Sequence, residues 1–172
     1  MVASTLVSLE EYLRTTYRPD CDYVDGAVLE RNVGQRDHAY LQSRIPIWFW
    51  KNRQTLRLVA LTEQRMQVAP GRFRVPDVCV VGIPMPNESV FTSPPCIVIE
   101  VLSPDDSFAS LQTKLDDYLD MGVPNVWVMD PATRRPWQVT KQGHFEALDG
   151  MLRSTDSAVA LPVSELFDSS DL

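Results

Sequence analysis

Two acidic residues interrupt apolar stretches in the middle of the chain. Asp77 lies within Val75–Val81 and Glu100 within Cys96–Leu102, and both stretches have the composition of buried β-strands. A buried carboxylate is costly unless it is paired or binds a metal. Two of them in neighbouring strands therefore predict a divalent-cation site, and the hydrolysis of phosphodiesters is the chemistry that explains them most economically.

The geometry of β-strands indicates how the two acids could meet. Side chains along a strand alternate between its two faces, so Asp77 shares a face with Cys79, and Glu100 shares one with Val98. If the strands are neighbours in a suitable register, both carboxylates converge on one point. Mg²⁺, with Mn²⁺ as an alternative, would find there the oxygen ligands that hard cations prefer.

A nuclease of this kind also benefits from a protein cation near the attacking water. The usual position, two residues after the second acid, holds Leu102. Lys114 can substitute for it, because it follows Leu111 by three residues and precedes Tyr118 by four. This spacing places the lysine at the margin of the apolar stripe of a helix, from which its amine can reach the sheet.

Helices and strands in mixed order must position these residues. Three helices are expected. The first runs from Ser8 to about Thr15, and the third runs from the Ser103–Ser107 segment to Gly122. The second starts at an Asp37 cap, and Pro46 should kink or split it. Strands are expected as a Tyr23–Leu29 hairpin turning at Asp25-Gly26, at Leu56–Ala60, Glu63–Val68, Arg72–Val81, Cys96–Leu102 and Asn125–Asp130, and as a hairpin of Pro136–Thr140 with His144–Leu148. Gly82–Pro95 reads as a surface loop. This order predicts an α/β (α+β mixed-sheet) fold in one domain, 1–172.

Composition narrows the class of protein. The 172 residues suffice for a real core, and no stretch is long and apolar enough to cross a membrane. The three cysteines, Cys21, Cys79 and Cys96, lack metal-type spacing and read as reduced core residues of a cytoplasmic protein. A formal net charge of −7 argues against a non-specific positive coat for nucleic acid, but an acidic active site contributes to that total.

Taken together, these residues resemble the Uma-two family, a group of inferred endonucleases in the PD-(D/E)XK, restriction-endonuclease-like superfamily. The resemblance is carried, in order, by Pro76-Asp77, Glu100-Val101-Leu102-Ser103-Pro104, Lys114 with Tyr118, Gly122-Val123-Pro124, and Trp127 with Asp130-Pro131. It runs from the Asp25-Gly26 hairpin to Leu161–Phe167. It implies a restriction-endonuclease-like core, a central mixed β-sheet flanked by helices with N-terminal and C-terminal hairpins, and Mg²⁺-dependent cleavage of DNA.

The resemblance also implies roles for individual residues. By position, Asp77 and Glu100 match the metal-binding acids, and Lys114 matches a catalytic lysine that has moved from the strand to the helix. Asp22 falls where the family often has a glutamate, and His38 falls where a helix-start histidine is common, so both are expected as secondary members of the site. Because many enzymes of this type cut both strands as dimers, a homodimer is expected.

Other interpretations of the same residues stay open. Asp77 can end a turn by accepting hydrogen bonds from backbone amides, and Glu100 can form a structural ion pair with Lys114. His38 can cap or pack at the start of its helix, and Asp22 can be a turn residue.

Three functions therefore compete. The first is a Mg²⁺-dependent DNA endonuclease. The second is a module with a degraded nuclease site that binds nucleic acid or protein without cleavage, which is motivated by the net charge, the shortened Asp22, and Ser110 standing where many relatives have an aspartate. The third is a metal-dependent hydrolase of another phosphate ester.

Overall fold

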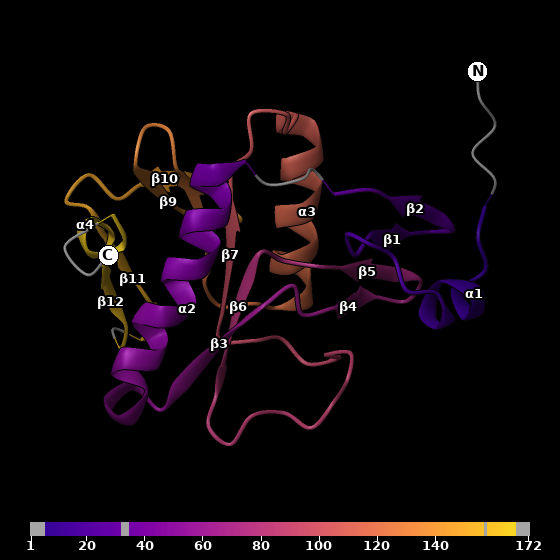
Figure 1. The fold of residues 1–172 in the computed structure, drawn as a ribbon, viewed down its shortest axis with the longest axis horizontal. Helices are drawn as coiled ribbons and strands as arrows, with labels where there is room; N and C mark the ends of the chain where they lie inside the picture. The colour runs from indigo at the N-terminus through magenta and orange to yellow at the C-terminus, as the bar shows by residue number, and fades with distance from the viewer. Residues whose placement is uncertain (1–5, 32–34, 157, 168–172) are drawn as a thin grey trace.

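The computed structural model describes residues 6–31, 35–156 and 158–167 (Figure 1). In chain order the elements are α1 (Leu9–Arg14), β1 (Asp22–Val24), β2 (Ala27–Leu29), α2 (Arg36–Leu56), β3 (Leu58–Thr62), β4 (Met66–Ala69), β5 (Arg72–Arg74), β6 (Val78–Gly82), β7 (Ile97–Val101), α3 (Phe108–Met121), β8 (Val126–Asp130), β9 (Arg135–Thr140), β10 (Gly143–Glu146), β11 (Met151–Arg153), β12 (Ala160–Pro162) and α4 (Val163–Leu166). Among these residues, no helix has the length and apolar character needed to cross a membrane.

A six-stranded mixed sheet forms the centre of the fold, in the order β10-β9-β8-β7-β6-β3. Strands β7 and β8 are parallel and are joined through α3, whereas the other neighbouring pairs are antiparallel. Helices α2 and α3 cover opposite faces of this sheet (Figure 1). The mixed sheet with flanking helices confirms the predicted fold class.

Alternating side chains explain why the sheet accepts a helix on each face. Val80 and Ile99 point to the side where Leu41, Ile45 and Phe49 of α2 are buried. The alternate residues of β6 and β7, Cys79, Val81 and Val98, point to the side where Leu115 and Tyr118 of α3 are buried. Because Glu100 follows Val98 by two residues, its side chain faces α3.

A smaller sheet, in the order β2-β1-β5-β4, lies beside α3 (Figure 1). Its β1–β2 hairpin turns at Asp25 and Gly26, both with positive φ, as the Asp-Gly sequence predicts. Arg72 and Arg74 of β5 form ion pairs with Asp117 of α3. These contacts fasten the small sheet to the helix that carries Lys114.

The predicted strand Arg72–Val81 is wrong as one element, because it divides into β5 in the small sheet and β6 in the central sheet. Pro76 lies at the division and has no N–H to donate to a strand ladder. The amide of Val75 instead donates to Asp22 Oδ1 at 2.8 Å. Asp77 consequently lies in a bend just before β6 rather than inside a strand.

Helix α2 also differs from expectation. It begins at Arg36 with Gln35 at the N-cap position, so Asp37 lies in the first turn and is not the cap. Pro46 does not split the helix, which continues to Leu56. Leu41, Ile45 and Phe49 are buried on both sides of the proline, and their packing offsets the lost backbone hydrogen bond.

The remaining predicted elements are present, but two strands are shifted along the chain: Leu56, expected in a strand, ends α2, and β3 and β4 begin at Leu58 and Met66. Helix α1 has the Ser8 cap, and α3 runs from a Ser107 cap to Gly122, whose φ of +94° suits glycine. Strands β9 and β10 form the predicted hairpin. The short elements β11, β12 and α4 were not predicted, since segments of three or four residues show no clear period.

Candidate active site

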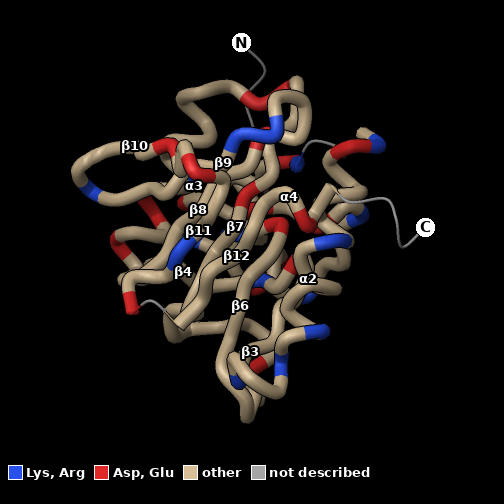
Figure 2. The backbone as a smooth tube through the Cα atoms, turned by 90° about the vertical axis from the view of Figure 1, so that its left-hand side faces the viewer, with Lys and Arg blue, Asp and Glu red and all other residues tan. Residues whose placement is uncertain are grey.

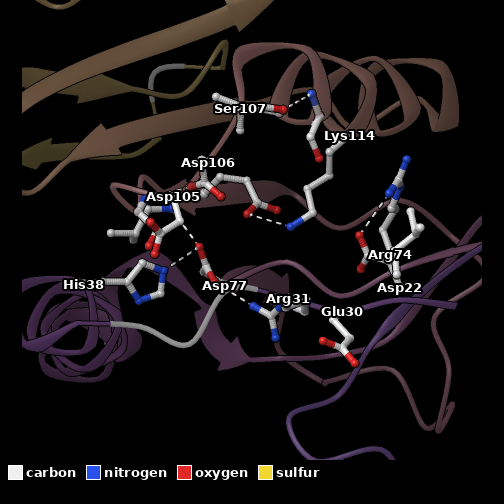
Figure 3. Close-up of a pocket in the computed structure, with 16 residues that line it drawn as sticks. Asp22, Glu30, Arg31, His38, Arg74, Asp77, Asp105, Asp106, Ser107 and Lys114 are labelled. Atoms are coloured by element: carbon white, nitrogen blue, oxygen red, sulfur yellow. Dashed lines mark hydrogen bonds and ion pairs between the residues drawn. The ribbon is translucent and has the colours of Figure 1, made fainter. Parts of the chain in front are cut away.

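A cavity of about 240 Å³ opens where the central sheet meets α2, α3 and the small sheet (Figure 3). All five residues that the sequence predicted for the site line it: Asp22, His38, Asp77, Glu100 and Lys114. They come from five different segments of the chain, and the fold alone brings them together. Their chemical roles stay a prediction.

The register of β6 and β7 explains why the two acids meet. Val78 pairs with Ile99 in the antiparallel ladder, so the next position along brings Asp77 opposite Glu100. Asp77 Oδ2 accepts a hydrogen bond of 2.9 Å from the backbone amide of Val101. Each carboxylate is only 4% exposed, so both acids lie at one nearly dry point.

Asp77 is held as a carboxylate by three donors. Besides the Val101 amide, Arg31 Nη2 donates to Oδ1 at 2.6 Å, and His38 Nε2 lies 3.3 Å from Oδ2. Burial works against its charge, but the His38 hydrogen bond and the charges of Lys114 and Arg31 outweigh burial and lower the pKa of Asp77 to about 2. Asp77 is therefore ionised at neutral pH.

Glu100 has the opposite electrostatic balance. Its Oε2 accepts from Lys114 Nζ at 3.1 Å, and its Oε1 accepts from the Tyr118 hydroxyl at 2.7 Å. Burial raises the pKa of Glu100 to about 7, because the lowering effect of Lys114 does not offset the loss of water and the nearby Asp77 charge. The two acids thus titrate far apart, a property typical of functional sites.

Lys114 lies on the helix face predicted for it. Burial disfavours its ammonium, but the carboxylates of Glu100, Asp22 and Asp77 outweigh burial and raise its pKa. The ion pair with Glu100 that the sequence left open as a structural alternative is present. An ammonium carries three donors, so this pair leaves Nζ the capacity to donate to a second acceptor in the cavity.

His38 approaches Asp77 from the first turns of α2. The hydrogen bond to Asp77 raises the pKa of His38, although burial opposes its charged form. A carboxylate only accepts, so the Nε2 atom carries the proton in this contact. Its Nδ1 is buried and, among the described residues, has no hydrogen-bond partner, and the same holds for Ser103 Oγ on the cavity wall.

Asp22 belongs to a buried ion network as well as to the cavity. Its Oδ1 accepts from the Val75 amide, and its Oδ2 accepts from Arg74 Nη1 at 3.0 Å. Arg74 is 4% exposed and also donates to Asp117 at 2.7 Å. Asp22 is thus more than a simple turn residue, and it fixes the start of the segment that leads to Asp77.

Sequence reasoning did not assign Arg31, Arg74 or the Tyr118 hydroxyl to this site. The spacing of Tyr118, four residues after Lys114, places both side chains on one helix face and could have suggested the hydroxyl. Nothing in the local sequence marks Arg31 or Arg74, because their partners lie 46 and 52 residues away.

The protein ligands for a metal are few. Across residues 6–31, 35–156 and 158–167, no group of three or more His, Cys, Asp and Glu side chains is arranged to hold a metal ion. Asp77 and Glu100 are the two acids that the sequence predicts as metal ligands, and the cavity that they line is also lined by Asp22, Glu30, Asp105 and Asp106. Two carboxylates suit Mg²⁺, which keeps several waters and is commonly held by one or two carboxylates together with substrate phosphates.

Comparison with known proteins supports a nuclease relationship. The family model described as "Uma2: Putative restriction endonuclease" matches residues 9–160. The crystal structure of a "putative nuclease belonging to DUF820" from Anabaena variabilis ATCC 29413 has a TM-score of 0.78 and 23% sequence identity, covering 94% of this chain and 97% of that one. At this identity the likeness shows the fold alone.

A second structure, the cryo-EM structure of a DrdV–DNA complex, has a TM-score of 0.43 and 14% identity. It covers 65% of this chain and 10% of the DrdV chain. No curated protein sequence matches the chain significantly.

Proposed function

The chain belongs to the Uma2 family, described as putative restriction endonucleases, and we propose that it is a divalent-cation-dependent DNA endonuclease. Asp77 and Glu100 would hold Mg²⁺ or Mn²⁺, and Lys114 would act on the attacking water or the developing phosphorane charge. Asp22 and His38 would support this group.

One observation carries the proposal. The carboxylates of Asp77 and Glu100, two residues that are each 4% exposed, converge from the bend before β6 and from β7 on one cavity that is also lined by Lys114. Keeping two acids this close without water costs free energy that a purely structural role could avoid with apolar residues. A cation bound between the two carboxylates would compensate both buried charges.

The residues present fit a hard divalent cation. The donor set consists of oxygen atoms alone, and the low pKa of Asp77 keeps that carboxylate ready to coordinate at neutral pH. Glu100, with a pKa near 7 in the metal-free protein, would lose its proton on binding a cation. Ser103 Oγ, buried and without a described partner on the same cavity wall, can accept a hydrogen bond from a coordinated water.

The chain's own residues would then divide the work of phosphodiester hydrolysis. A bound cation would supply polarisation of the phosphate and a lower pKa for the attacking water. Lys114 Nζ would donate to that water or to a phosphate oxygen while Tyr118 keeps Glu100 oriented. His38 would help to hold Asp77 in place through its contact with Oδ2.

Several wider features belong to this proposal. Residues 1–172 would act as one restriction-endonuclease-like domain in the cytoplasm, where the three free cysteines would stay reduced. A homodimer would allow both DNA strands to be cut, and Trp50 and Ile47 on α2, 58% and 43% exposed, are apolar surface that a second copy could cover. Basic and acidic segments are interspersed on the side shown in Figure 2, so DNA contact would be local to the cavity.

The test is cleavage of plasmid and single-stranded DNA in Mg²⁺ or Mn²⁺. Wild type should cut, and Glu100→Gln should lose at least about a hundredfold in rate, as expected for loss of a group that acts in the transition state. Glu146→Gln is the matched control, since Glu146 lies on the β9–β10 hairpin and pairs with Arg135 away from the cavity. Equal cleavage by wild type and Glu100→Gln would refute the assignment.

A second function, a binding module without cleavage, is favoured by one observation. Every oxygen of Asp77 and Glu100 already accepts a hydrogen bond from the protein. In that case calorimetry should detect no Mn²⁺ binding by the metal-free protein. Mn²⁺ binding that disappears in Asp77→Asn would contradict the binding module.

A further inference from the structure

Arg31 is a buried cation that contacts a proposed metal ligand. It lies between β2 and α2, lines the cavity, and has a side chain only 10% exposed. Its Nη2 donates to Asp77 Oδ1 at 2.6 Å (Figure 3), and its Nη1 lies 3.3 Å from Glu63 Oε1. The acids Asp77, Glu100 and Glu63 raise its pKa although burial opposes the charge, so the guanidinium stays protonated.

The two oxygens of Asp77 have different surroundings. Oδ2 is held by the Val101 amide and by His38. Among the described residues, Arg31 is the hydrogen-bond donor to Oδ1. A divalent cation that binds Asp77 through Oδ1 would meet the positive charge of the guanidinium at the same place, so the two cations repel each other and compete for that oxygen.

Glu63 provides a second anchor that does not depend on Asp77. Its side chain is 49% exposed and contacts the other terminal nitrogen of Arg31. If Nη2 leaves Asp77, the Glu63 contact keeps the guanidinium beside the cavity rather than in bulk solvent. The donor freed in this way suits a phosphate oxygen, because the planar guanidinium matches phosphate geometry.

We propose that Arg31 is an exchangeable countercharge. It neutralises Asp77 Oδ1 in the metal-free protein, and it transfers to a phosphate oxygen of the DNA when a divalent cation takes that oxygen. The inference rests on the proposed function and adds a phosphate-binding residue and a competitor for the cation to the same site.

The first measurement is Mn²⁺ binding to the metal-free protein by calorimetry. Arg31→Met should bind Mn²⁺ roughly tenfold more tightly than Arg36→Met, because breaking one charge-assisted hydrogen bond to Asp77 is no longer required. Arg36→Met is the matched control, since Arg36 lies five positions later, is largely exposed, and pairs only with its neighbour Asp37 among the contacts described. It corrects for the change in net charge.

A conservative variant keeps the test valid if Arg31→Met does not fold. Arg31→Lys keeps the countercharge, but its single amine cannot bridge Asp77 and Glu63. Its Mn²⁺ affinity should therefore lie between those of wild type and Arg31→Met. An affinity no tighter than wild type would overturn the exchange.

The second measurement is the salt dependence of DNA binding, with and without Ca²⁺. Ca²⁺ is chosen because its coordination geometry is irregular and poorly suited to a reaction that uses the octahedral coordination of Mg²⁺. With Ca²⁺, the slope of log K against log salt should be steeper by about 0.9 for wild type than for Arg31→Met, the value of one phosphate contact on duplex DNA. Without a cation the two slopes should agree, because Arg31 is then engaged by Asp77. Equal slopes in Ca²⁺, or a difference that is also present without a cation, would overturn the transfer to phosphate.

The failure of this inference can be told from the failure of the proposed function. If Asp77→Asn abolishes Mn²⁺ binding while Arg31→Met matches Arg36→Met, the metal site holds and only the exchange is wrong. If Asp77→Asn binds Mn²⁺ as wild type does, the metal site and the exchange are both wrong.

Discussion

The hydroxyl of Tyr118 offers a sharp test of how Glu100 is held. Tyr118 is fully buried, and its hydroxyl donates to Glu100 Oε1 at 2.7 Å. Tyr118→Phe keeps the ring and removes that donor, so a buried carboxylate oxygen loses its hydrogen bond. Hydrogen bonds to charged groups contribute about 1.5–3 kcal/mol, and we expect a loss of about 2–3 kcal/mol in the free energy of unfolding.

Tyr23→Phe is a matched control. Tyr23 is 5% exposed, and its hydroxyl donates at 3.0 Å to the backbone carbonyl of Val7, a neutral acceptor. Its loss should cost only about 1 kcal/mol. In a protein of this size 1 kcal/mol shifts Tm by about 2–4 °C, so the two variants should differ by several degrees.

The assay is urea and thermal unfolding at about pH 8.5 in the presence of a chelator. At that pH Glu100, with a pKa near 7, is ionised in the metal-free protein, so the hydrogen bond is made to a full charge. Equal losses in the two variants would refute the reasoning, because they would show that Tyr118 donates to no more than an ordinary acceptor. A loss below about 0.5 kcal/mol in Tyr118→Phe would do the same.

Three further predictions concern other parts of the molecule. Burial raises the pKa of Glu100 from 4.5 to about 7, so the contribution of Glu100 to the stability of the metal-free protein is full below pH 4.5 and falls by about 3 kcal/mol as the pH rises through 7. Glu100→Gln should flatten this part of the pH profile of the free energy of unfolding. An unchanged profile would contradict the prediction. Asp22→Asn should lower the free energy of unfolding by about 2–3 kcal/mol, since Arg74 loses one of its two buried carboxylates; a neutral or stabilising effect, measured by urea unfolding, would count against its structural role. Pro46→Ala should raise the unfolding free energy by about 1–3 kcal/mol by returning an N–H to α2, and a lower Tm would show that the proline ring packs better than alanine there.

Local sequence was enough for most of the elements. The Ser8 cap, the Asp25-Gly26 turn and the end of α3 at Gly122 were predicted correctly, because each acts on backbone groups within a few residues. The two acids were also singled out from sequence, because a buried carboxylate within an apolar stretch is costly, although Asp77 lies in a bend just before β6 and only Glu100 lies inside a strand.

The face of α3 that carries Lys114 was likewise predictable. Helix periodicity places Leu111, Lys114 and Tyr118 within reach of the sheet without knowledge of the fold. Helical spacing therefore predicted that the lysine amine could reach the sheet, and the ion pair with Glu100, which the sequence left open as an alternative, is present at 3.1 Å.

Tertiary structure decided what each acid contacts. Arg31 meets Asp77 across 46 residues, and Arg74 meets Asp22 across 52. It also divided the segment from Arg72 to Val81 between two sheets at Pro76, although its composition favoured a single strand.

The physical reason is the range of the interactions. Caps, turns and the period of apolar residues act over one or two helical turns, so the sequence by itself determined most of the longer elements and predicted which residues could do chemistry. The opposite pKa shifts of Asp77 and Glu100 depend on burial and on charges brought in from distant segments, and only the packed fold sets both.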